Sequence, residues 1–347
     1  MILFTFSLII VSDCDFFATQ TNQNNPGLYK TTREKMSISI IIGTLGFIMA
    51  AYAVIANDSA QTLGTFIASN KESKWQWQWL TMATVMVATL TYGYMSGDIA
   101  HGRLDAIPQP DVFKWYHLAA PALLLGLTRF GVPVSTTILT LSVFSSTFVL
   151  EKILLKSAMG YALAAVAAYA LWNLLSRFLD EKAPVAEKNK SKWRVAQWVA
   201  TCFLWHQWLA HDIANVAVFL PRGEALPLWM FVSFMGILVA GLAHLFYRRG
   251  GKIQEIVLSK SGTRFMRSAT IIDFSYALIL WYFKQYNNIP MSTTWVFVGL
   301  LCGRELAVYR HFKTKDGIKM VFPMLMADFM KMMLGLALSI VLVWFIS

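Results

Sequence analysis

Two short polar motifs each occur twice in this sequence. Asn57-Asp58 corresponds to His211-Asp212, and the triplet Ser135-Thr136-Thr137 corresponds to Ser292-Thr293-Thr294. The two aspartates lie 154 positions apart, and the two triplets lie 157 positions apart. Because two different motifs recur at nearly the same offset, the sequence predicts an internal repeat that carries the same chemistry in each half.

The Ser-Thr-Thr triplets have the composition of an anion-binding helix start. Each follows a proline, which suits the first turn of a helix, and Ser or Thr hydroxyls cap free backbone N–H groups there. The remaining N–H groups and the positive end of the helix dipole attract an anion. A single triplet would rather indicate hydroxyls bonded back to their own helix, but the pairing favours a site. The candidate anion-binding residues are Ser135, Thr136, Thr137, Ser292, Thr293 and Thr294.

The two aspartates are candidate cation ligands. Asp58 and Asp212 each end a long apolar stretch, where an ionised carboxylate is costly unless it is paired or solvated. With Asn57 and freed backbone carbonyls they would bind a hard cation such as sodium and offset the charge of the anion. The alternative is that they cap helices at the membrane interface. Gln61 and Asn215 occupy matched positions after the aspartates and are candidate substrate-binding residues.

Two further residues are candidates for ion coupling. His211 titrates near neutral pH and would suit a proton relay, although a lone histidine is more often a hydrogen-bonded core residue. Asp273 lies 17 residues before Pro290, on the segment that leads into the second triplet. We therefore include both residues among the candidates for coupling to sodium or protons.

The composition places these motifs in a membrane. Of the 347 residues, 56% are hydrophobic and only 14% are charged, so apolar side chains must face lipid. Two shorter apolar stretches, 132–149 and 289–306, contain proline, glycine and hydroxyl residues and indicate broken or re-entrant crossings. The predicted full spans are residues 37–57, 79–95, 115–130, 157–179, 193–211, 227–247, 265–286 and 322–346.

The basic residues report topology and not a nucleic-acid partner. The net charge is +11, and the lysines and arginines gather in 180–194, 248–267 and 303–320. Under the positive-inside rule all three stretches are cytoplasmic, which agrees with the number of crossings between them. Five crossings in the first half would start the second half on the opposite side of the membrane, which makes the repeat an inverted one.

The predicted organisation has four parts. Residues 1–35 form an N-terminal extension outside the fold, with Met36 as the favoured start. Residues 36–180 form the first transmembrane repeat, 181–194 a basic cytoplasmic linker, and 195–347 the second repeat. An enzyme is not indicated, because the sequence has no HExxH motif, no Ser-His-Asp order and no cysteine cluster.

On these motifs the sequence resembles the PiT-type inorganic phosphate transporters, a family that includes sulfate carriers. Each half of that family carries a Gly-Ala-Asn-Asp-Val-Ala-Asn segment and, later, Pro-Val-Ser-Thr-Thr-His. The matching residues are Ala56, Asn57, Asp58, Ala60, Gly64, Thr65, Ser69, Pro133, Val134, Ser135, Thr136 and Thr137 in the first half, and Ala210, Asp212, Ala214, Asn215, Pro290, Ser292, Thr293, Thr294 and Gly299 in the second.

Several positions depart from the family pattern. His211 and Gln61 replace asparagines, Ile138 and Trp295 replace the histidines after the triplets, and no acidic residue stands near Thr91. The resemblance is therefore to a divergent member.

The resemblance implies an all-α integral membrane fold of two inverted repeats, each of about five transmembrane segments, with Ser-Thr-Thr motifs on the broken helices. It implies secondary active transport of inorganic phosphate coupled to sodium or protons, with no cofactor other than sodium itself. The alternatives are a carrier of sulfate or a related oxyanion, or a non-transporting receptor or scaffold. The expected location is a cell membrane, the inner membrane of a bacterium, and the expected assembly is a homodimer.

Overall fold

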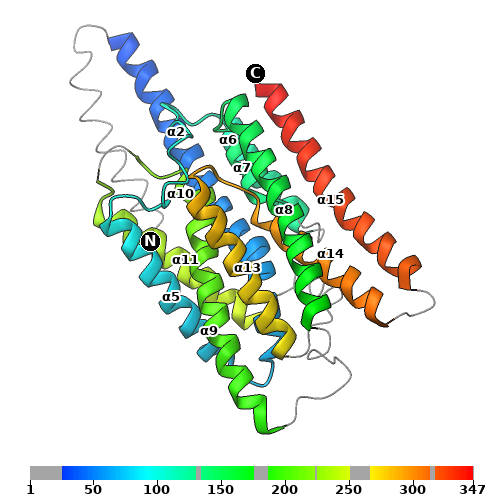
Figure 1. Cartoon of the computed structure of the whole chain (residues 1–347). Helices are drawn as coiled ribbons and strands as arrows, with labels where there is room; N and C mark the ends of the chain where they lie inside the picture. Colours follow the sequence, from blue (N-terminus) through cyan, green and yellow to red (C-terminus); the bar gives the residue numbers. More distant parts are fainter. Residues whose placement is uncertain are drawn as a thin grey trace.

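In the computed structural model, residues 26–129, 134–175, 187–222, 225–250, 266–312 and 317–346 are described, and these residues are helical with no β-strand (Figure 1). The helices are α2 (Pro26–Ala53), the π-helix η1 (Val54–Ser59), α3 (Ala60–Thr62), α4 (Gly64–Ser69), α5 (Trp75–Met95), α6 (Trp115–Arg129), α7 (Thr136–Ser142), α8 (Thr147–Leu175), α9 (Glu187–Asp212), α10 (Ala214–Ala217), α11 (Leu228–Tyr247), α13 (Met266–Tyr286), α14 (Thr293–Phe312) and α15 (Gly317–Ile346). The all-helical membrane fold expected from the sequence is therefore confirmed at this level.

The observed helices differ from the predicted spans mainly at their ends. α2 begins at Pro26, a favourable first helical residue, so 26–35 continue the first helix and residues 1–25 lie outside the described residues. α8 starts ten residues earlier than predicted, because 147–156 are helical despite their charged residues. In the described part of the predicted broken crossing 132–149, the short helix α7 is followed by a break and the first turn of α8, whereas 289–306 is irregular only at its start and then continues as α14.

Three described stretches are long and apolar enough to cross a membrane, namely Lys35–Thr62, Thr147–Leu174 and Leu228–Tyr247. This is fewer than the eight spans predicted. α9 and α13 are also long, but they carry buried polar side chains such as Gln197, Asp212 and Asp273, which lower their mean hydropathy. Part of the polarity that reduces the apolar signal therefore comes from side chains directed into the protein, and part from the charged and exposed start of α9.

Helices that are distant in the sequence pack in pairs. α2 packs on α6, α9 on α13, α5 on α11, α8 on α14, and α7 on α15. The contact of α8 with α14 is especially close, because a Cβ atom at Gly299 would lie 2.3 Å from the Tyr161 carbonyl oxygen, and one at Gly303 only 2.0 Å from that of Ala165. Small residues allow such backbone approach between membrane helices.

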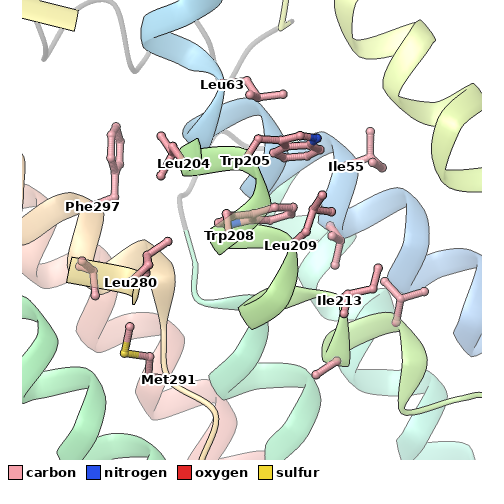
Figure 2. Close-up of a cluster of buried hydrophobic side chains, with 14 of the residues drawn as sticks. Ile55, Leu63, Leu204, Trp205, Trp208, Leu209, Ile213, Leu280, Met291 and Phe297 are labelled. Carbon is pink, nitrogen blue, oxygen red and sulfur yellow. The ribbon is translucent and has the colours of Figure 1, made fainter. Parts of the chain in front are cut away.

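A tryptophan pair organises the core where α9 ends. The rings of Trp205 and Trp208 stack with centroids 4.8 Å apart, and Trp205 Nε1 donates to the Met82 carbonyl at 3.0 Å. In Figure 2 the two rings lie beside Leu209, and Ile213 lies at the break that follows α9. The pair lies within about the last two turns of α9, which ends at Asp212.

Candidate ion-binding site

The two aspartates lie where helices are irregular. Asn57 and Asp58 belong to η1, the π-helical segment between α2 and α3, and Asp212 is the last residue of α9 before the break at Ile213. Asn57, Asp58 and Asp212 are 0%, 2% and 1% exposed. A π-helical turn and a helix break both change the regular pattern of backbone hydrogen bonds, so each carboxylate is buried beside backbone groups that an ion can use.

Neither aspartate caps a helix in the structure. The residues before η1, α3 and α10 are Ala53, Ser59 and Ile213, and none of them makes a capping hydrogen bond through its side chain. Asp212 Oδ1 instead accepts a hydrogen bond from Asn215 Nδ2 at 3.0 Å and one from Thr137 Oγ1 at 3.1 Å. The capping alternative therefore does not describe the observed contacts.

Each Ser-Thr-Thr triplet stands at a helix start. Ser135 Oγ accepts a hydrogen bond from the Ile138 amide at 3.1 Å, and Ser292 Oγ accepts one from the Trp295 amide at 3.1 Å. All six triplet residues are buried, whereas Pro133 lies outside the described residues. In each triplet the serine therefore caps the helix, and the two threonine hydroxyls are left for other partners.

The threonine hydroxyls bring the two halves of the chain together. Thr137 donates to Asp212, and Thr294 Oγ1 donates to Asp58 Oδ1 at 3.5 Å. The hydroxyls of Thr136 and Thr293 also face Asp58 and Asp212, respectively. Each carboxylate is thus contacted by one threonine from each triplet. We refer to Ser135–Thr137 as the first seat and to Ser292–Thr294 as the second seat.

Three side-chain amides complete the centre. Asn57 Nδ2 donates to Asp58 Oδ1 at 2.7 Å and to the Val134 carbonyl at 2.9 Å, just before the first seat. Gln61 Nε2 donates to Asn57 Oδ1 at 2.9 Å, one helical turn along. Asn215 Nδ2 bridges Thr137 Oγ1, at 3.2 Å, and Asp212. The structure therefore brings Asn57, Gln61 and Asn215 to the same centre as the aspartates and seats.

The centre holds buried acceptors without donors. Among the described residues, Asp58 Oδ2, Asp212 Oδ2 and Asn215 Oδ1 are buried and have no hydrogen-bond partner. The two carboxylates also repel one another. Buried carboxylate and amide oxygens are ligands for hard cations, and a cation would relieve both the repulsion and the missing hydrogen bonds. Sodium therefore fits the donor set that the sequence suggested.

His211 is directed away from this centre. Its Nε2 lies 2.8 Å from the Leu280 carbonyl oxygen and 3.4 Å from an Arg103 guanidinium nitrogen. Because a carbonyl only accepts, Nε2 carries the proton, and its contact with Arg103 joins two donors and is no hydrogen bond. His211 Nδ1 is buried without a partner among the described residues.

Asp273 lies in a second polar cluster. Its carboxylate oxygens accept hydrogen bonds from Thr65 Oγ1 at 2.5 Å and from Thr201 Oγ1 at 2.6 Å, and the residue is 1% exposed. These contacts join α13 to α4 and α9. Unlike Asp58 and Asp212, Asp273 has a donor for each oxygen.

Sequence reasoning did not identify Tyr276, which also lies at the centre. The Tyr276 hydroxyl donates to the Thr293 carbonyl at 2.9 Å, and the residue is 1% exposed. It follows Asp273 by three positions, so both side chains share one face of α13. The three-residue spacing from Asp273 was the sequence feature that could have identified Tyr276. Tyrosine is common in membrane helices, however, and Tyr276 has no matching residue in the other half of the repeat.

The described chain is a helical fold with apolar, membrane-length helices around a buried centre of carboxylates and hydroxyls. Among solved structures, the chain is similar to one described as "The sodium-dependent phosphate transporter", with a TM-score of 0.59 and 18% sequence identity over 90% of this chain and 99% of that chain. No family model matches the sequence, and the search of curated proteins gives no match. The resemblance to phosphate transporters is thus confirmed in the fold, and the low identity is that of a divergent chain.

Proposed function

We propose that this protein is a secondary transporter of inorganic phosphate driven by a cation gradient. The observation that carries the proposal is the cross-connection of the two halves, in which Thr137 donates to Asp212 and Thr294 donates to Asp58. It puts two hydroxyl-rich helix starts and two carboxylates with unsatisfied oxygens into one buried centre. The likeness to a sodium-dependent phosphate transporter supports the same function.

In this proposal the two seats bind the anion and the aspartates bind the driving cation. Free N–H groups and threonine hydroxyls at two helix starts supply donors to a tetrahedral oxyanion. Asp58, Asp212 and Asn215 supply oxygens to sodium, whose charge offsets that of phosphate. Because the hydroxyls that would bind phosphate also contact the carboxylates, occupation of one site changes the other, which is the requirement for coupling.

The helix packing supports the inverted repeat. When the two halves of the repeat are exchanged, α2 and α6 of the first half correspond to α9 and α13 of the second half. Likewise α8 corresponds to α15, and α14 corresponds to α7. Both members of each exchange occur as contacts in the structure. The reciprocal bonds at the seats follow the same exchange, as expected for a two-fold relation. We further propose a multi-pass protein of a bacterial inner membrane, with the basic stretches cytoplasmic, assembled as a homodimer.

Asp273 and His211 are the proposed secondary coupling residues. The Asp273 carboxylate with the Thr65 and Thr201 hydroxyls gathers several oxygens at one buried point, which suits a second sodium ion. His211 would serve a proton path if protons and not sodium drive uptake.

The test is uptake of radiolabelled phosphate into proteoliposomes. We expect accumulation under an inward sodium gradient and little without it, with an imposed pH gradient tested separately and excess sulfate added as competitor. Stronger competition by sulfate than by unlabelled phosphate would assign the site to sulfate. The absence of uptake under every gradient, from protein that still binds phosphate, would indicate a non-transporting receptor and overturn the proposal.

A further inference from the structure

Two buried positive charges lie beside the second seat and take no part in the centre described above. Arg103, in the connection between α5 and α6, is 0% exposed, and Lys156, on α8, is 4% exposed. Charged groups in a protein interior are normally paired with an opposite charge. Among the residues that the structure describes, neither side chain forms an ion pair with a carboxylate.

Both cations converge on the same short segment. Arg103 donates to the Asn287 carbonyl at 2.7 Å, and Lys156 Nζ donates to the Asn287 carbonyl at 3.0 Å, to Asn287 Oδ1 at 2.7 Å and to the Ile289 carbonyl at 2.7 Å. Carbonyl and amide oxygens carry only partial charges, so the groups that Arg103 and Lys156 are bonded to do not neutralise their positive charge.

The cation pair lies next to the entrance of the second seat. Ser157, the residue after Lys156, accepts a hydrogen bond through Oγ from the Ser292 amide at 2.8 Å, so α8 contacts the segment 287–292 at both of its ends. On the other side, Arg103 touches His211, the neighbour of Asp212. Arg103 thus links the connection 96–114 to the neighbour of Asp212, and Lys156 lies next to the residue that binds the second seat.

One donor of the pair is left unused. Arg103 Nε is buried and has no hydrogen-bond partner among the described residues. Burial lowers the pKa of Arg103 to about 10, partly offset by the charges of Asp212, Asp105 and Asp98, so the guanidinium remains positive at neutral pH. An anion bound beside Arg103 would both offset the positive charge of the buried guanidinium and accept a hydrogen bond from its free N–H group.

We propose that Arg103 and Lys156 form a fixed-cation binding site for a small inorganic oxyanion, separate from the two seats and adjacent to the second one. The site extends the proposed function, because in the topology above it faces the outside and would receive phosphate before the seats do. The positive charge of this site belongs to side chains of the protein itself. Anion binding there therefore needs no sodium, whereas binding at the seats depends on the cation held by Asp58 and Asp212.

The experiment measures saturable binding of radiolabelled inorganic phosphate to the purified full-length protein, with and without sodium. The pair variant Arg103→Gln with Lys156→Gln is compared with the charge-retaining variant Arg103→Lys with Lys156→Arg. A seat variant, Thr136→Val with Thr293→Val, is measured in parallel. We expect a sodium-independent component that persists in the seat and charge-retaining variants and weakens about tenfold or more in the pair variant.

A matched control separates binding from folding. Arg222 also donates to backbone carbonyls of the 96–114 connection, those of Leu104 at 3.3 Å and Ile107 at 2.7 Å. Arg222 Nε and Nη2 also lack partners among the described residues, but the side-chain hydrogen bonds of Arg222 go to Leu104 and Ile107 and not to the 287–289 segment. Arg222→Gln therefore tests whether one unpartnered arginine is sufficient, and it should leave the sodium-independent component unchanged. If the pair variant does not fold, the single change Lys156→Gln provides the measurement, because Arg103 still holds the Asn287 carbonyl in it.

Two results would overturn this inference. One is a wild-type protein in which all phosphate binding requires sodium, and the other is a pair variant whose sodium-independent binding equals that of the wild type. The proposed function has its own readout, because its failure would remove sodium-stimulated binding and gradient-driven uptake while a fixed-cation site would remain detectable.

Discussion

Thr137 donates a hydrogen bond to Asp212 at 3.1 Å although the two residues are 75 positions apart, one at the start of α7 and the other at the end of α9. The contact crosses from one half of the chain to the other. It means that the hydroxyl proposed to donate to the anion gives its single proton to the carboxylate proposed to bind the cation, so the two ligands compete for the same donor arrangement.

Replacing Thr137 by valine should weaken phosphate binding. The side chain keeps its shape but loses the donor, and a hydrogen bond to a charged partner contributes about 1.5–3 kcal/mol, which corresponds to a loss of affinity of about tenfold to a hundredfold. Thr140→Val is the matched control, since Thr140 lies on the same helix, is fully buried and has a hydroxyl without a partner among the described residues. Equal affinities in the two variants would place the anion away from the first seat.

The sequence predicted the class of fold and the members of the centre, but not how they pair. Within each half the aspartate precedes its triplet by a similar distance, and a repeat cannot show which copy meets which. The observed bonds cross between halves because α7 packs near α10 and the break after α9. The π-helix at Asp58 was also beyond prediction, because its sequence has no feature that distinguishes it from a regular helix.

Residues without a counterpart in the repeat were missed for a different reason. Arg103, Lys156 and Tyr276 have side chains in or beside the centre, but no matching residue in the other half drew attention to them. Basic residues in a membrane protein are expected in loops, which holds for most of those in this chain. Only the folded structure shows that Arg103 and Lys156 are buried.

The contact between α8 and α14 predicts a stability effect. A Cβ atom at Gly303 would lie 2.0 Å from the Ala165 carbonyl oxygen, and because this is backbone, the helices must separate. We expect Gly303→Ala to cost about 1–3 kcal/mol and to lower the unfolding temperature measured in detergent. Gly236→Ala is the control, because a Cβ atom at Gly236 would have no neighbour within 4 Å among the described residues; a helical alanine there should be neutral or slightly stabilising. Equal unfolding temperatures for the two variants would contradict the close approach.

The second polar cluster allows a separate prediction about sodium. If Asp273 with Thr65 and Thr201 holds a second cation, Thr201→Val removes one oxygen ligand and should lower the apparent sodium affinity about tenfold or more, while phosphate binding at saturating sodium stays unchanged. Thr270→Val is the control, because the Thr270 hydroxyl donates to the Met266 carbonyl of its own helix. If the sodium dependence of uptake is unchanged in Thr201→Val, Asp273 binds no cation and only joins the helices through hydrogen bonds.

The last prediction concerns the driving cation. Changing Asp58 or Asp212 to asparagine keeps an oxygen for the threonine hydroxyls but removes the charge, so hydrogen bonding in the centre is largely retained while the binding of a hard cation weakens sharply. We expect Asp58→Asn and Asp212→Asn proteins to insert normally yet to lose gradient-driven uptake, with sodium no longer raising phosphate affinity. Because linkage between two binding sites is reciprocal, phosphate should equally lose its effect on sodium affinity, measured by titrating each ligand in the presence of the other. Accumulation of phosphate against its gradient by both variants, with wild-type sodium dependence, would show that these carboxylates only shape the centre, and the coupling role would then pass to Asp273 or to a proton path through His211.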